Sequence, residues 1–140
     1  MTIGNGSEPL TLDPHKATGT WEDRVISDVT VGLIQSAPDG SPMPGMAQSW
    51  ETSADGLTWT FHLRDAVWSD GVPVTADDFV FSLQRILDPA TASEYASLLF
   101  FIVNAQPVNE GKMPPAALGV SAPDKKTLEI RLTHPAPYLP

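Results

Sequence analysis

The chain has 140 residues, of which 8 are Lys or Arg and 17 are Asp or Glu, so its formal net charge is −9 at pH 7. This length suffices for one domain with a hydrophobic core and is too short for two full domains. The acidic balance argues against nucleic acid, whose phosphates require a basic surface, and against an anionic membrane surface. The absence of cysteine excludes disulfides, thiolate nucleophiles and zinc–thiolate sites.

Neither a transmembrane segment nor a signal peptide is predicted. No apolar run approaches the ~20 residues that are needed to span a bilayer. Residues 1–6 lack the basic start and the apolar stretch of a secretory signal. If the protein is exported, we therefore expect this sequence to represent a mature or recombinant form.

Residues 1–46 are predicted to hold one helix flanked by loops. Between positions 22 and 33, apolar residues recur at near-helical spacing, although several of them are β-branched. The loop before this helix contains Trp21, the tryptophan that we most expect to be exposed. After the helix, a Pro-Asp-Gly turn and the prolines Pro42 and Pro44 predict a connector without regular structure.

A strand, a turn and a capped helix follow in close succession. Between positions 57 and 63 apolar residues alternate with Thr and His, as in a strand with one buried face, and 47–51 leads into it. Thr75 stands at an N-cap position, with Asp78 three residues later as its partner in a capping box. The helix ends at Asp88, because a residue that precedes proline is disfavoured in helical geometry.

One further strand is clearly predicted beyond this helix. Positions 90–103 fit either a helix or a buried strand, and the prolines of 104–117 predict a loop with one helical turn. Alternation at 127–132 predicts the strand, after a hairpin turn at 124–126. The elements together predict an α+β fold, with a small mixed or antiparallel sheet and flanking helices.

No motif for metal binding or catalysis is complete. Asp13 and His15 are two candidate metal ligands, but a proline separates them and the remaining ligands are missing, which favours a solvated loop. His62 is expected on the outer face of its strand, and His134 precedes a proline in a loop without a recognisable partner. A nucleophile elbow and a phosphate-binding loop are both absent.

Four carboxylates near the strand-to-helix region could supply a catalytic pair. Asp65, Asp70, Asp77 and Asp78 leave a glycosidase-like arrangement open. A turn role for Asp70 and helix-start roles for Asp77 and Asp78 account for most of them. A small carboxylate-dependent hydrolase therefore stays as an alternative hypothesis.

Three of the four tryptophans lie close together in the sequence. Trp59 alternates with its strand neighbours, which favours a core position. Trp50 and Trp68 are expected to cover the same sheet.

Five segments, in their order and spacing, resemble the solute-binding proteins that deliver oligopeptides, dipeptides and nickel chelates to ATP-driven importers. Each segment is a weak signal alone, and their succession is specific. The last segment and the overall spacing are most similar to the oligopeptide-binding branch. The segments are 8–15, 45–51, 57–64, 68–80 and 88–97.

This resemblance implies that the chain is the N-terminal part of a two-lobed protein. Members of the family are several times longer, and their N-terminal part contributes the smaller accessory domain. Residues 1–32 would be a leading segment of the larger lobe and hinge, and 33–140 the accessory domain, truncated at its C-terminal end. Much of the ligand cavity, including the acidic residue that holds the peptide's amino terminus, would lie in later sequence, so the isolated chain would bind peptide weakly or not at all.

The resemblance also implies which residues contact a ligand. In the oligopeptide binders an extended peptide pairs its backbone with an early segment, which matches Thr18, Gly19 and Thr20. Where the family often has an acidic residue this chain has Thr18, so backbone pairing is implied and a side-chain role is not. A tyrosine that lines the peptide cavity matches Tyr95, for which a core position is the competing interpretation.

The implied protein is a binding protein and not an enzyme, and it needs no cofactor. Its partners would be a peptide and the membrane subunits of an ABC importer, with no nucleic acid. It would be periplasmic or extracellular, either free or anchored as a lipoprotein in its full-length form. A sensor or chaperone-like interaction domain on the same scaffold is an alternative, beside the hydrolase.

Overall fold

The computed structural model describes residues 6–136. Residues 1–5, on which the expectation about a signal peptide largely falls, and residues 137–140 lie outside this range. None of the described helices is long and apolar enough to cross a membrane. In chain order the elements are α1 (Thr20–Val29), β1 (Ile34–Ser36), β2 (Pro42–Pro44), β3 (Ala47–Thr52), β4 (Thr58–Leu63), α2 (Ala76–Leu87), η1 (Pro89–Thr91), η2 (Ala96–Leu99), α3 (Ala105–Asn109), η3 (Pro115–Ala117), β5 (Val120–Asp124) and β6 (Thr127–Arg131).

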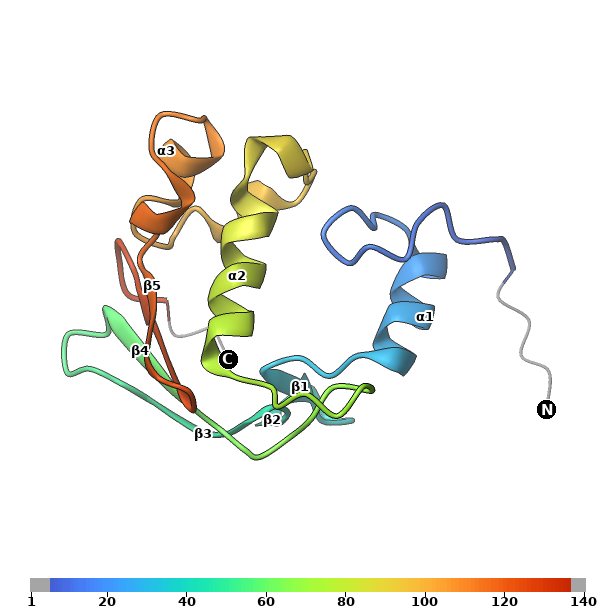
Figure 1. The fold of residues 1–140 in the computed structure, drawn as a ribbon, viewed down its shortest axis with the longest axis horizontal. Helices are drawn as coiled ribbons and strands as arrows, with labels where there is room; N and C mark the ends of the chain where they lie inside the picture. The colour runs from blue at the N-terminus through green and yellow to red at the C-terminus, as the bar shows by residue number, and fades with distance from the viewer. Residues whose placement is uncertain (1–5, 137–140) are drawn as a thin grey trace.

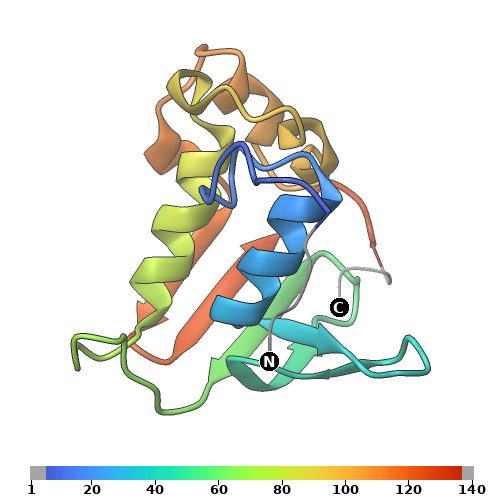
Figure 2. The same cartoon turned by 90° about the vertical axis from the view of Figure 1, so that its right-hand side faces the viewer.

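A four-stranded antiparallel sheet in the order β3-β4-β6-β5 forms the centre of the fold. Helix α2 packs against β5 and β6, and it lies between this sheet and α1 (Figure 1). The segment that precedes α1 reaches from that helix toward the C-terminal end of α2 (Figure 2). The predicted α+β class is confirmed, and its sheets are antiparallel.

The two predicted strands supply the core, as their alternation indicated. Trp59, Phe61 and Leu63 of β4 are buried, and the residues between them are half-buried on the other face. Phe61 pairs with Leu128 of β6, and Trp59 pairs with Ile130. The apolar side chains of both strands lie on the face of the sheet that α2 covers. The alternation of apolar and polar residues was therefore sufficient to predict both strands and their buried faces.

Helix α2 begins and ends at the predicted residues. The backbone N–H of Thr75 donates to Asp78 Oδ2 at 2.8 Å in a capping box. Asp88 caps the next turn by accepting from the N–H of Ala90 at 2.9 Å. The local chemistry of the two ends therefore defines the helix independently of its packing.

The predicted turn at Pro38-Asp39-Gly40 is present, but the expectation that Pro42 and Pro44 prevent regular structure is wrong. Residues Pro42–Pro44 form β2, which pairs with β1 in a separate two-stranded sheet. Proline is tolerated there because β2 has only one partner strand and Met43, between the prolines, retains its N–H. The first helix is also shifted from 22–33 to Thr20–Val29, so Trp21 lies inside α1 and not in a loop.

Trp68 does not cover the sheet as expected, because it lies on the loop before α2 and is 51% exposed. Trp50 does pack against the core, and Trp21 is exposed as predicted. Positions 90–103 form neither a long helix nor a strand; they hold η1, η2 and a single bridge from Ile102 to Leu132. The predicted helical turn within 104–117 corresponds to α3.

Candidate functional site

The four candidate ligand-contacting residues come together from two distant segments. Thr18, Gly19 and Thr20 lead into α1, and Tyr95 precedes η2. The Tyr95 hydroxyl donates to the carbonyl oxygen of Thr18 at 3.2 Å, across 77 positions of sequence. Because Tyr95 is 48% exposed, its interpretation as a core residue is wrong. An exposed aromatic ring therefore lies beside the backbone of 18–20.

Gly19 is an extended residue at the N-cap of α1, with φ −108° and ψ 159°. The Glu22 side chain beneath it is only 3% exposed, and its Oε1 accepts from the backbone N–H of Leu10 at 2.7 Å. That hydrogen bond holds the pKa of Glu22 below its ordinary value. A Cβ on residue 19 would collide with Glu22 Oε2. Glycine at this position leaves room for the buried carboxylate, which sequence reasoning did not single out.

A second contact joins the leading segment to α2. Arg85 donates from Nη2 to Asp13 Oδ2 at 2.6 Å and from Nη1 to Asp13 Oδ1 at 2.8 Å. Its Nη1 also lies 2.6 Å from His15 Nδ1, and His15 Nε2 lies 3.0 Å from Ser82 Oγ. We call these four residues, Asp13, His15, Ser82 and Arg85, the Arg85 clasp.

The clasp defines the protonation of both residues in the leading segment. A guanidinium only donates, so His15 Nδ1 must accept and Nε2 carries the proton that is donated to Ser82. The hydrogen bond from Arg85 holds the pKa of Asp13 well below its usual range. Burial, and then the Arg85 charge, lower the pKa of His15. Asp13 and His15 were expected in a solvated loop; the ion pair with α2 shows that this expectation is wrong.

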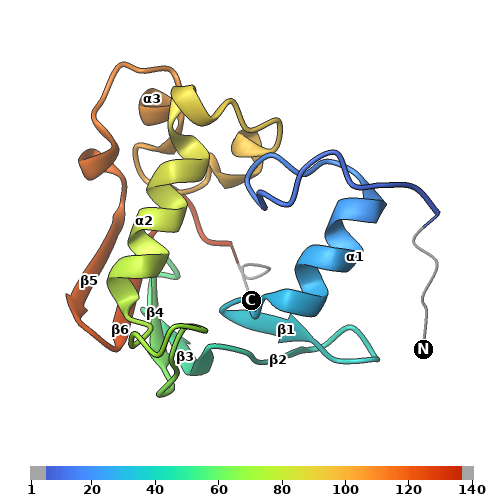
Figure 3. The same cartoon turned by 45° about the vertical axis from the view of Figure 1, so that its right-hand side comes forward.

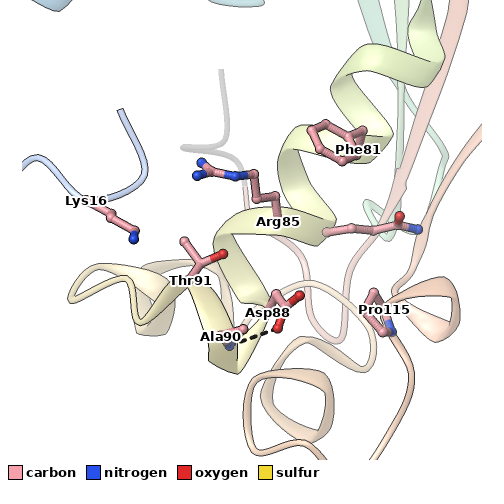
Figure 4. A pocket seen from close by; sticks show the side chains of 8 residues that line it. Lys16, Phe81, Arg85, Asp88, Ala90, Thr91 and Pro115 are labelled. Atoms are coloured by element: carbon pink, nitrogen blue, oxygen red, sulfur yellow. Dashed lines mark hydrogen bonds between the residues drawn. The ribbon is translucent and has the colours of Figure 1, made fainter. Parts of the chain in front are cut away.

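In the sequence, the clasp is indicated only by the Asp13-Pro14-His15 motif in a loop and by Arg85, which lies outside the apolar face of α2. Neither indicates that the two meet. A shallow pocket of about 410 Å³ opens beside Arg85, and the Arg85 side chain extends from α2 toward the segment that carries Lys16 (Figure 4). The pocket is lined by Lys16, Phe81, Gln84, Arg85, Asp88, Ala90, Thr91 and Pro115.

The other candidate chemical groups have structural partners. Asp70 accepts from the N–H of Val72 at 3.0 Å, and Asp78 belongs to the capping box. Asp65 lies 3.1 Å from Lys126 Nζ at the surface. Within residues 6–136 no group of three or more His, Cys, Asp or Glu side chains could hold a metal ion. Three of the four carboxylates thus serve a turn, a helix cap or a surface ion pair, and Asp77 lies in the first turn of α2, as expected.

The two remaining histidines lie at the surface. His62 Nε2 lies 3.5 Å from Glu51 Oε1 on the outer face of the sheet, as expected for that strand position. His134 Nδ1 lies 3.0 Å from the hydroxyl of Thr133. Neither histidine lines the pocket beside Arg85.

The leading segment leaves many large apolar side chains uncovered. Helix α1 buries only Glu22, and the helix stands apart from the four-stranded sheet, on the far side of α2 (Figure 3). These residues come from the loop before α1, from α1 itself and from the segment that follows it. The residues and their exposed fractions are Leu10 93%, Leu12 59%, Trp21 40%, Val29 76% and Val31 44%.

Known proteins similar to this chain share both its sequence and its fold. The periplasmic oligopeptide-binding protein OppA of Escherichia coli is 53% identical over 141 residues, a match that covers 99% of this chain and 26% of that protein. The crystal structure of Haemophilus influenzae OppA in complex with RPPGFSPFR superposes with a TM-score of 0.90 at 47% identity, covering 96% of this chain and 27% of that one. The Escherichia coli murein tripeptide binding protein MppA gives a TM-score of 0.89 at 48% identity, covering 94% of this chain and 26% of that one.

These matches confirm the resemblance that the five segments indicated, including the oligopeptide-binding branch. The chain spans about a quarter of the length of the curated relatives that it matches. Those relatives are named as binding proteins and not as enzymes, which confirms the choice made against the hydrolase. The family model described as "Bacterial extracellular solute-binding proteins, family 5 Middle" matches residues 41–140. The chain belongs to this family of bacterial extracellular solute-binding proteins.

Proposed function

We propose that this protein captures extended peptides in the periplasm and delivers them to the membrane subunits of an ABC importer. The contact between Tyr95 and Thr18 carries the proposal, because it places an exposed aromatic ring beside an exposed backbone segment. The relatives named above bind oligopeptides or a murein tripeptide, which supports the same class of ligand here.

The backbone of 18–20 offers groups that an extended peptide needs. Thr18 is exposed and Gly19 has an extended backbone. Their carbonyl oxygens already accept from Tyr95 and Asp23, whereas Thr20 begins α1, where the first N–H groups have no partner within the helix. A peptide carbonyl that accepts from such a group adds a strand-like partner without reading a side chain. Thr18, Gly19, Thr20 and Tyr95 are therefore our proposed peptide-contacting residues.

We further propose that 1–32 belongs to a larger lobe and to the hinge, and that 33–140 belongs to the accessory domain. The uncovered apolar side chains of the leading segment support this division, since a second lobe would bury them. The 140 residues alone would then bind peptide weakly or not at all. The full-length protein would be free in the periplasm or anchored there as a lipoprotein.

Calorimetry on the longest natural chain that contains these 140 residues tests the function. The probes are RPPGFSPFR and tri-alanine, each with and without N-methyl groups on its backbone. Backbone pairing predicts binding that tolerates side-chain changes and is weakened by N-methylation, because a methyl group on the amide nitrogen blocks the close backbone approach that strand pairing requires. Absence of binding by both peptides, or binding that is indifferent to N-methylation, would contradict the proposal.

A further inference from the structure

The Arg85 clasp lies outside the four proposed peptide-contacting residues, but it is connected to them by a short stretch of chain. We infer that Arg85 is a positioning residue for the peptide: through Asp13 and His15 it holds the 18–20 backbone at a fixed place beside Tyr95. This inference rests on the proposed function. It assigns a role in ligand affinity to a side chain that has no contact with the 18–20 segment.

Before α1, two neighbouring contacts tie the described part of the leading segment to α2 and to Tyr95. The first is the clasp, where Asp13 and His15 bind α2. The second is Thr18, whose carbonyl oxygen accepts from Tyr95. Between them, the N–H groups of Lys16 and Ala17 both donate to the Asp13 carbonyl at 3.0 Å, which closes a turn. The 18–20 backbone therefore cannot shift relative to Tyr95 without breaking one of the two attachments.

Both attachment points belong to one continuous piece of structure. Arg85 lies in the last turn of α2, and Tyr95 follows after η1. Asn109 of α3 also donates from Nδ2 to the Leu87 carbonyl at 3.2 Å, which ties the end of α2 to the next helix. The positions of Arg85 and Tyr95 are thus defined by the same packed elements. A peptide that pairs with 18–20 meets a backbone already held in place, which lowers the ordering cost of binding.

Arginine is required for this geometry, because the side chain makes three contacts at once. Two nitrogens of the planar fork serve the two Asp13 oxygens, and Nη1 also faces His15. A lysine ammonium keeps the charge but cannot present this bidentate pattern. Arg85→Lys is therefore a conservative change that should loosen the clasp while leaving one positive charge in place.

His15 makes the clasp sensitive to acid. Its neighbours are Arg85 and Ser82 from α2 and Asp13 from its own segment. Protonation of Nδ1 would place an N–H against the Arg85 guanidinium, where an acceptor is now needed. Asp13 favours the proton, whereas burial and Arg85 oppose it, and the net result is a lowered pKa. The clasp should therefore be complete at and above the ordinary His pKa of about 6.5 and weaken below it, as the pH falls through the lowered pKa of His15.

The experiment measures tri-alanine affinity in the longest natural chain, at a temperature well below the unfolding transition. Arg85→Lys should weaken binding roughly fivefold, the size of effect found for residues that act without touching a ligand. Lys16→Gln is the matched control, because it removes a positive charge from the same pocket wall and leaves the clasp intact. Its affinity should equal that of the wild type.

A pH series with His15→Asn provides the second readout. The Asn oxygen can accept from Arg85 in place of Nδ1 but does not titrate, so its binding should lose the acid weakening that the wild type shows below about pH 6.5. If the wild type binds and Arg85→Lys binds equally well, the inference is overturned while the proposed function stands. If Arg85→Lys fails to fold, an unchanged pH profile in His15→Asn overturns it. If the wild type binds no peptide, both fall together.

Discussion

Arg85 binds both carboxylate oxygens of Asp13, a residue 72 positions earlier in the chain, at 2.6 and 2.8 Å. The two side chains are partly exposed, 34% for Arg85 and 25% for Asp13, so solvent screens the pair. The pair nevertheless holds the pKa of Asp13 below its ordinary value. It joins the leading segment to α2, and it makes the stability of that junction dependent on pH.

Asp13→Asn tests this dependence. Because the folded-state pKa of Asp13 is depressed, its contribution is fully present above the ordinary Asp value of about 3.9 and is lost as the pH falls below it. At neutral pH the variant should melt about 2–4 °C lower than the wild type, and the difference should shrink in acid. Calorimetric melts across pH measure this. Glu8→Gln, an exposed carboxylate of the same segment, should show neither effect, and an equal loss there would refute the assignment.

Trp59→Ala should remove a large part of the core. Trp59 is 8% exposed and its ring stacks on Phe61 with centroids 6.3 Å apart. Truncation of a buried aromatic costs roughly 3 to 5 kcal/mol, enough to unfold many domains of this size. Trp68→Ala is the control, since Trp68 is 51% exposed and surface changes stay within about 0.5 kcal/mol. Urea unfolding that gives a soluble, cooperative Trp59→Ala with near wild-type stability would disprove the core assignment.

Tyr95→Phe should separate binding from stability. The change removes the hydroxyl that donates to Thr18 and keeps the ring. In the longest natural chain we expect peptide affinity to fall about three- to tenfold, corresponding to one hydrogen bond, while the melting curve stays unchanged. Tyr95→Leu, which also removes the ring, should lose more. Equal affinities for all three proteins would return Tyr95 to a purely structural role.

Gly19→Ala should conflict with the buried Glu22 side chain. An added Cβ collides with Glu22 Oε2, although the φ of −108° is allowed for alanine. The single variant should therefore melt below the wild type. In a Glu22→Ala background the same change should cost less, because the colliding carboxylate is gone. A double-mutant cycle by calorimetry measures this coupling, and additive losses would show that the collision is relieved in another way.

Local chemistry was sufficient for the centre of the fold. The alternation of 57–63 predicted β4, because each residue's face follows from its parity. Thr75 and Asp78 predicted the start of α2, because a capping box acts within four residues. Reasoning from neighbouring residues alone also led to the wrong expectation that the prolines at 42 and 44 prevent a strand. A proline disrupts a strand only where a neighbouring strand needs the N–H that proline lacks. In the folded protein β1 is the strand that pairs with β2, and the sequence around the prolines does not reveal this pairing.

By itself, the sequence determined the elements whose causes lie within a few residues, and through its five segments it also determined the family. Only the tertiary structure decided that Asp13 meets Arg85, that Thr18 meets Tyr95 and that Glu22 lies beneath Gly19. The first two contacts join residues more than 70 positions apart, and the Glu22 carboxylate of the third is held by the backbone N–H of Leu10, 12 positions earlier. Periodicity records which face of an element is apolar. It carries no information about which polar side chains are brought together when those faces pack.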